Sequence, residues 1–274
     1  MAFAPRNKNN AIAEVAFVIS LAGKPDVHLI EKFSESHASE WSEEFPIKDE
    51  VRGQKLQLGP DMSVGPQILE STLDGALFRT LQRDGSLDWQ VAIEGSLLKV
   101  NCGSYSRWAN VWPTARGYLN RLCKQFVSSS TPVTSVALQY VDEFVWTSSE
   151  DTYDATTLFK RESEYFLPRM CSAGHLWHLH LGWFEKHNLP AEGRRLERVH
   201  IDAIEEAPIK RLATRIDITL RHDFSKRLND QVQLFGTRSE GVLDKMFETM
   251  HVRNKEMMKS LMTSQMADRI GLND

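Results

Sequence analysis

The chain has 274 residues, a formal net charge of -4 and 26% charged residues. This length can bury a core without disulfides or metals, and the weak negative charge creates no field that would gather nucleic acid, so a general nucleic-acid-binding role is disfavoured. The three cysteines, Cys102, Cys123 and Cys171, are odd in number and include no CxxC pair. They indicate neither a disulfide framework nor a thiolate zinc site, and they favour a reducing cytoplasm.

The first half begins with a run, Ala11 to Leu21, that alternates apolar and polar side chains and therefore predicts a half-buried strand. Glu14 and the shortness of this run exclude a bilayer span, and we expect neither a signal peptide nor a transmembrane segment. Helical spacing predicts a helix over 26–44, with Asp26 as its cap. After the Gly/Pro-rich stretch GPDMSVGP come three short strands, GALFRTLQ, LDWQVAI and SLLKVNC, and then a helix that starts near Trp108.

The second half repeats this order of elements. TSVALQYVDEFVW predicts a long strand, residues 153–170 show a weaker helical pattern, and HLWHLHLGWF, RLERVHIDAI and RLATRIDITL predict three strands. A helix over 236–262 closes the set. We therefore predict an α+β fold of two pseudo-duplicated units, 1–130 and 131–274, each a strand, a helix, an antiparallel meander and a helix, packed as one body. This order resembles the TATA-binding-protein-like or helix-grip arrangement, an analogy of shape alone.

Three segments carry a resemblance to a family: AIAEVAFVISL, SVALQYVDEF and MFETMHVRNKEMMKSLMTSQMADRIGL. Together they resemble the sporadically distributed prokaryotic family of unknown function, which is about this long. That family's middle motif reads like Arg-Tyr-x-Asn-Arg, whereas this chain has Gln139, Tyr140, Val141, Asp142 and Glu143, which keeps only the tyrosine. The resemblance implies a horizontally moved accessory gene, such as a component of anti-phage defence, and hence a sensor or partner-binding role.

Four histidines between His175 and His187 raise the question of a metal site. On a strand, His178 and His180 point to one side while Trp177, Leu179, Leu181 and Trp183 point to the other. Pairing of the meander in order would bring His200 and Asp202 to the same polar face, and two histidines with a carboxylate suit zinc or non-haem iron. The alternative, which we favour, is a polar sheet face whose imidazoles pair with carboxylates across the strands.

Two further candidate sites lie in the second half. Arginine guanidinium groups at Arg194, Arg198, Arg215 and Arg221 suit a small anion, a nucleotide or a lipid head group, although interleaved carboxylates would give a salt-bridged surface instead. The closing helix holds methionines that could form an adaptable surface for a partner, a lipid interface or a second copy, namely Met250, Met257, Met258, Met262 and Met266. Core packing is the competing interpretation of these methionines.

No catalytic signature is present: HExxH, GxSxG, P-loop and GxGxxG patterns are all missing from the sequence. No motif indicates a cofactor. We therefore expect a non-enzymatic cytoplasmic sensor or adaptor that binds a protein partner, a second copy, a lipid or a small anion. A metal-dependent enzyme centred on His178 and His180 is the alternative from another functional class.

Overall fold

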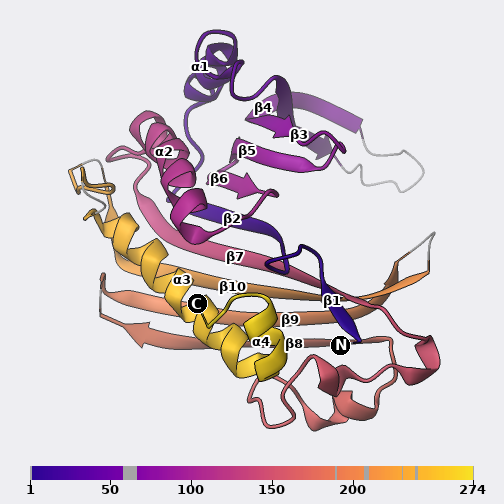
Figure 1. Ribbon diagram of the computed structural model, residues 1–274. Coiled ribbons are helices and arrows are strands. Elements are labelled where there is room, and N and C mark those ends of the chain that lie inside the picture. The colour runs from indigo at the N-terminus through magenta and orange to yellow at the C-terminus, as the bar shows by residue number, and fades with distance from the viewer. Residues whose placement is uncertain are drawn as a thin grey trace.

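A computed structural model describes residues 2–57, 67–188, 190–206, 210–229, 231–237 and 240–273. Within these ranges ten strands form one antiparallel sheet, in the order β3-β4-β5-β6-β2-β7-β10-β9-β8, with β1 paired to β7 (Figure 1). The strands are β1 (Phe3–Pro5), β2 (Ile12–Leu21), β3 (Ile47–Gln57), β4 (Gln67–Leu81), β5 (Leu87–Glu94), β6 (Leu97–Cys102), β7 (Val133–Trp146), β8 (Trp177–His187), β9 (Gly193–Glu206) and β10 (Arg211–Leu228). The protein is therefore mixed α+β, built on a large antiparallel sheet.

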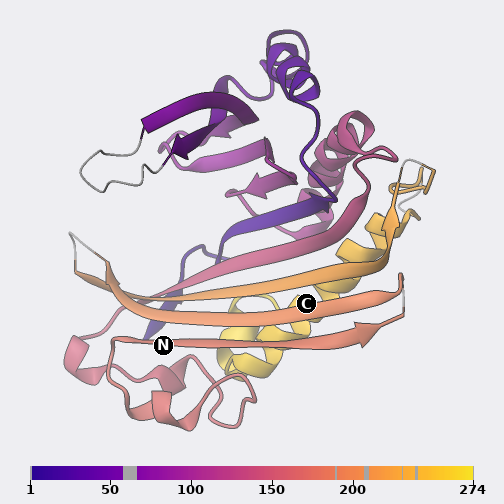
Figure 2. The same ribbon diagram turned by 180° about the vertical axis from the view of Figure 1, so that it is seen from behind.

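The helices cover one face of this sheet and leave the other face open (Figures 1 and 2). The four α-helices among the described residues are α1 (Val27–Ser36), α2 (Trp108–Phe126), α3 (Val242–Leu261) and α4 (Ser264–Arg269). A π-helical turn, η1 (His37–Trp41), continues α1, and three 3-10 turns follow β7: η2 (Glu150–Thr152), η3 (Ala155–Thr157) and η4 (Pro168–Ser172). None of the described helices combines the length and the apolarity that a membrane crossing needs.

The sheet continues across the boundary between the two predicted units. β2 and β7 pair at its centre, and in each half the last strand of the meander, β6 or β10, lies beside that central strand. The strand order is thus mirrored about the β2–β7 pair. One hydrophobic cluster contains residues from both halves, so the two units share a sheet and a core.

Several predicted elements are confirmed, and others are corrected. The Asp26 side chain accepts a hydrogen bond from the His28 amide at 2.8 Å and caps α1, as its position predicted. Strands β1 and β3 were not predicted, and the GPDMSVGP stretch lies outside the described residues.

The helix predicted over 153–170 is wrong, since this segment consists of turns. Its buried side chains, Leu158, Phe159, Tyr165 and Phe166, recur every seven residues, which resembles a helical stripe. The backbone bonds nevertheless differ from those of a helix: one of them, from the Lys160 amide, goes to the Leu261 carbonyl at the end of α3, at 2.9 Å. Most of the other amides close short local turns, such as Ser163 to the Lys160 carbonyl at 3.2 Å and Phe166 to the Ser163 carbonyl at 3.3 Å, so no continuous i to i-4 ladder forms.

The methionines of α3 and α4 are core residues. Those proposed as an adaptable surface are at most 2% exposed: Met250, Met257, Met258, Met262 and Met266. Met258, Met262 and Met266, which lie off the main stripe of α3, are buried because α4 folds back and the turn segment packs against the end of α3 through the Phe159–Met262 bridge. The prediction of an exposed methionine surface is therefore wrong.

Candidate functional site

The most unusual group of side chains lies where strand β7 faces helix α3. Tyr140 and Asp142 are two residues apart on β7, so both point toward the helix-covered side, where the strand is otherwise apolar. His251 and Asn254 are three residues apart on α3 and share the face that turns to the sheet. These four polar side chains meet in an otherwise apolar core.

Tyr140 and His251 form the centre of this group. The Tyr140 hydroxyl lies 2.9 Å from His251 Nδ1, and Tyr105 reaches Tyr140 from the loop before α2. Burial raises the pKa of Tyr140 and raises that of Tyr105 to about 12, so both phenols keep their protons at neutral pH. Burial, with nearby Lys255, lowers the pKa of His251 to about 4. The imidazole is therefore neutral, and a phenol that donates to Nδ1 leaves the ring hydrogen on Nε2.

Stacked aromatic rings hold His251 in place. The His251 ring lies 4.2 Å from the Trp108 ring, within 3° of parallel, and Trp108 stacks in turn on Trp112 at 5.3 Å. The Trp108 indole nitrogen donates to Glu248 one turn before His251 on α3, at 2.7 Å. This stack ties α2 to α3 and fixes the orientation of the imidazole.

Asp142 is the exceptional member of the group. Asp142 is only 4% exposed to solvent. Its carboxyl receives no hydrogen bond and forms no ion pair with any residue that the structure describes. Burial without compensation raises its pKa from 3.8 to about 7. A carboxyl in this state costs stability when it ionises, and groups of this kind are concentrated at functional sites.

The group lines a cavity of about 450 Å³. Asp142, Tyr140 and His251 face it together with the apolar side chains of Ile12, Met258, Ile270 and Leu272. The amide nitrogen of Asn254, which also lines the cavity, is buried and has no hydrogen-bond partner among the described residues. The cavity thus offers a free carboxyl, a free amide donor and an aromatic wall, a combination typical of small-molecule sites.

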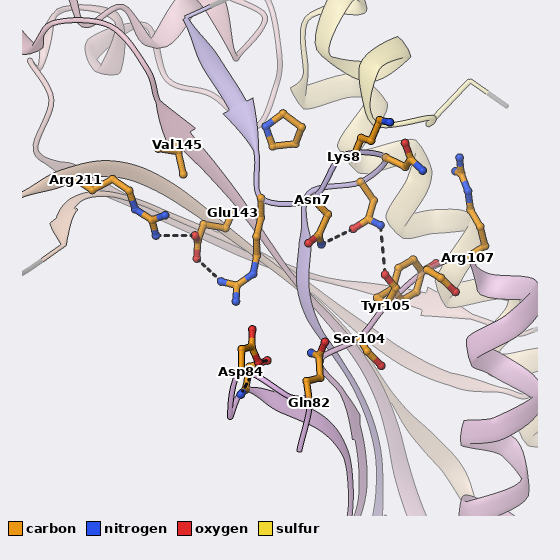
Figure 3. Close-up of a pocket in the computed structure, with 17 residues that line it drawn as sticks. Asn7, Lys8, Gln82, Asp84, Ser104, Tyr105, Arg107, Glu143, Val145 and Arg211 are labelled. Carbon is orange, nitrogen blue, oxygen red and sulfur yellow. Dashed lines mark hydrogen bonds and ion pairs between the residues drawn. The ribbon is translucent and has the colours of Figure 1, made fainter. Parts of the chain in front are cut away.

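A second cavity, of about 740 Å³, shares four lining residues with the first, namely Asn10, Tyr105, Ser106 and Arg107. Figure 3 shows the residues that line this larger cavity. Among these shared residues, the Asn10 amide nitrogen donates to the Tyr105 carbonyl at 3.3 Å, and the Asn10 side-chain oxygen accepts from Asn7 at 3.1 Å. This larger cavity opens between the loop after β1, the β4–β5 turn and the ends of β7 and β10.

The predicted metal ligands lie together on the open face of the sheet. His178 is opposite Asp202 and His180 is opposite His200 on neighbouring strands; the rings of His180 and His200 stack at 5.0 Å, and His200 Nε2 lies 3.1 Å from Asp202. These residues share one polar face, as the order of the meander predicted. The imidazole–carboxylate contact, however, joins two residues of the same strand, β9, and the predicted pairing across strands stays a prediction. Whether the group holds a metal stays a prediction.

Another group of possible metal ligands occurs in the described part of the chain. The ligand atoms of Glu185, His187 and Glu197 lie within 4.8 Å of one another. Glu197 is fully buried, and its oxygens are already taken by Arg253 at 2.8 Å and by Arg195 at 2.5 Å. Two guanidinium groups on one carboxylate favour a buried ion-pair cluster over a cation site.

The predicted anion-binding arginines also lie on the open face, and each has a partner. Arg198 is 3.5 Å from Asp217, Arg215 is 3.5 Å from Glu143, and Arg221 is 2.8 Å from Asp223. The Arg194 guanidinium lies over the Phe184 ring at 4.7 Å. Interleaved charges therefore compensate this face, which corresponds to the salt-bridged alternative, and anion binding there stays a prediction.

Comparison with known proteins finds no matching family model, no matching curated protein and no matching solved structure. The resemblance to the sporadically distributed family therefore stays a prediction. The three segments that carry it nevertheless meet in space, since residues from each of them line the 450 Å³ cavity: Ile12, then Tyr140 and Asp142, then His251, Asn254, Met258 and Ile270. In the sequence, only Asp142 and Asn254 indicated this site. Each of them places a polar side chain on an otherwise apolar stripe.

Proposed function

We propose that this protein is a non-enzymatic sensor that binds a small molecule in the cavity beside Asp142. One observation carries the proposal: a buried carboxyl, without a donor among the described residues, lines a cavity large enough for a metabolite-sized ligand. A stability cost of this kind persists in natural proteins where function requires it. A ligand that donates hydrogen bonds to Asp142 would supply the missing partner.

In the proposed sensor, ligand binding in the cavity changes the rest of the protein through α3. His251 and Asn254 touch the cavity from this helix, and its far end bonds to the turn segment through Lys160. Ligand contact at Asp142 would thus bias the position of α3 relative to β7. The response would reach a cytoplasmic partner, either a neighbouring gene product or a second copy, in an accessory system such as anti-phage defence.

The finer fold assignment belongs to the same proposal. We infer an internal duplication of the TATA-binding-protein-like kind, supported by the mirrored strand order about the β2–β7 pair and by helices confined to one face. In this arrangement the cavity lies near the centre of the molecule, between the two central strands and the last helices of each half.

A thermal-shift screen against a broad panel of polar metabolites tests the proposal. Three proteins are compared: the wild type, Asp142→Asn, and Asp202→Asn as a matched control on the open face. We expect at least one compound to raise the melting temperature of the wild type and of Asp202→Asn but not of Asp142→Asn. A panel in which every response is equal in all three proteins would contradict the proposal.

A further inference from the structure

The charge of Asp142 indicates which kind of ligand the 450 Å³ cavity prefers. Asp142 lines this cavity, and its carboxyl has no hydrogen-bond or ion-pair partner among the described residues. A neutral donor would leave an uncompensated negative charge in the core, whereas a cation removes it. The cost of burying Asp142 is already part of the folded state, so a cationic ligand adds only the cost of its own desolvation.

The positive side chains around the same cavity do not supply this counter-charge. Arg107 and Lys255 also line the cavity, and both have interaction partners of their own. Lys255 contributes to the lowered pKa of His251, whereas burial alone raises the pKa of Asp142. The carboxyl therefore lies in surroundings that resemble an apolar core, outside the influence of either cation.

The remaining lining selects an organic cation rather than a metal ion. Asp142 is the only acidic side chain among the described residues that line this cavity, and hard metal cations require several oxygen ligands. Carbon atoms dominate the wall elsewhere, from Ile12, Met258, Ile270 and Leu272. A ligand with one charged group and an apolar body matches this distribution of charge and carbon.

We propose that the cavity binds a primary amine with an apolar body, whose ammonium group pairs with Asp142 while the body lies against the apolar lining. This assignment rests on the proposed sensor function and names the ligand class of the same site. The ammonium donates charge-assisted hydrogen bonds to the carboxylate, and the body gains free energy by leaving water. The bound amine holds Asp142 in its ionised form.

Calorimetric titration and thermal shift with four small compounds test the assignment. At a phenethylamine concentration 100-fold above its Kd we expect the melting temperature to rise by about 5 °C. The alcohol of the same shape, 2-phenylethanol, should bind at least roughly tenfold more weakly, because it carries no charge. Ethylamine lacks the ring and should also bind at least roughly tenfold more weakly. The anion 3-phenylpropionate should give no shift.

The pH dependence of phenethylamine binding identifies the carboxyl that holds it. Asp142, with a pKa of about 7, becomes largely ionised between pH 6 and pH 8, so the affinity should rise about tenfold over this range. The pKa of His251, about 4, and that of Tyr105, about 12, lie outside this range, and that of Tyr140 is raised well above its usual value. Asp142→Asn should abolish the rise and weaken phenethylamine at least roughly tenfold at pH 8, whereas Asp202→Asn should keep both.

Three results would overturn the amine assignment: equal binding of phenethylamine and 2-phenylethanol, tighter binding of 3-phenylpropionate, or an affinity for phenethylamine that does not change with pH. The metabolite screen separates this assignment from the sensor proposal. If a compound without an amine gives an Asp142-dependent shift while phenethylamine does not, the amine assignment fails and the sensor proposal stands. If no compound gives such a shift, both fail.

Discussion

Replacing Asp142 with asparagine should stabilise the protein at neutral and alkaline pH. The substitution keeps the shape of the side chain and removes the charge that the core does not compensate. The carboxyl has a pKa of about 7 in the folded protein and an ordinary value of 3.8. The folded state therefore binds more protons than the unfolded state between these two values, and the stability of the wild type falls as pH rises through this window.

The size of the effect follows from the pKa difference. A rise of about 3 units, at roughly 1.4 kcal/mol per unit, gives a cost of about 4 kcal/mol once Asp142 is fully ionised. Asparagine has no ionisable side chain, so position 142 of the variant adds no such cost to its free energy of unfolding as the pH rises. The stability difference between variant and wild type should thus grow by roughly 1.4 kcal/mol per pH unit from pH 5 to 6.5 and level off above pH 7.

Guanidinium denaturation of both proteins at intervals from pH 5 to 8.5 measures this difference. Asp202→Asn is the control, because its carboxylate is partly exposed and accompanies His200 on the open face. A flat difference curve for Asp142→Asn, or a variant less stable than the wild type at pH 8, would refute the assignment of Asp142 as an uncompensated carboxyl.

Three further substitutions test other parts of the structure. Arg253→Ala leaves the buried Glu197 with fewer donors and should lower the free energy of unfolding by about 3 kcal/mol, measured by denaturation against Arg253→Lys. Met258→Glu should unfold the chain or lower its melting temperature strongly, because the side chain is 2% exposed; a native circular dichroism spectrum with an unchanged melting temperature would contradict this. His178→Ala with His180→Ala should change stability by less than about 0.5 kcal/mol, because both side chains are exposed, and elemental analysis before and after the change decides whether they hold a metal.

The sequence predicts the elements whose side chains follow one period. The central strands, the meanders, α2 and the stripe of α3 were all expected, since each has a continuous apolar face. The turn segment after β7 was mistaken for a helix because the spacing of its buried residues is helical, although its backbone bonds form short separate turns and one bond to the end of α3. The burial of Met258, Met262 and Met266 depends on α4 folding back, which is a tertiary contact that no local pattern contains.

The candidate site was harder to predict because its residues come from distant parts of the chain. Tyr140 and His251 are far apart in sequence and meet only when α3 packs on β7. The position of Asp142 on the apolar face of its strand was visible, yet a strand pattern alone cannot show whether such a carboxyl finds a partner. The histidines drew attention because they are close in sequence, and their cross-strand neighbours were expected correctly from the pairing of the meander.

The ionisation of Asp142 in the intact protein tests the proposed site most directly. Carboxyl carbon resonances of aspartate-labelled protein can be followed from pH 5 to 8.5, with the Asp142 signal assigned by its loss in Asp142→Asn. We expect a midpoint near 7, which is the value set by burial without a partner. A carboxyl that stays ionised throughout this range would mean that the folded chain already supplies a donor, and the case for a ligand at Asp142 would fall.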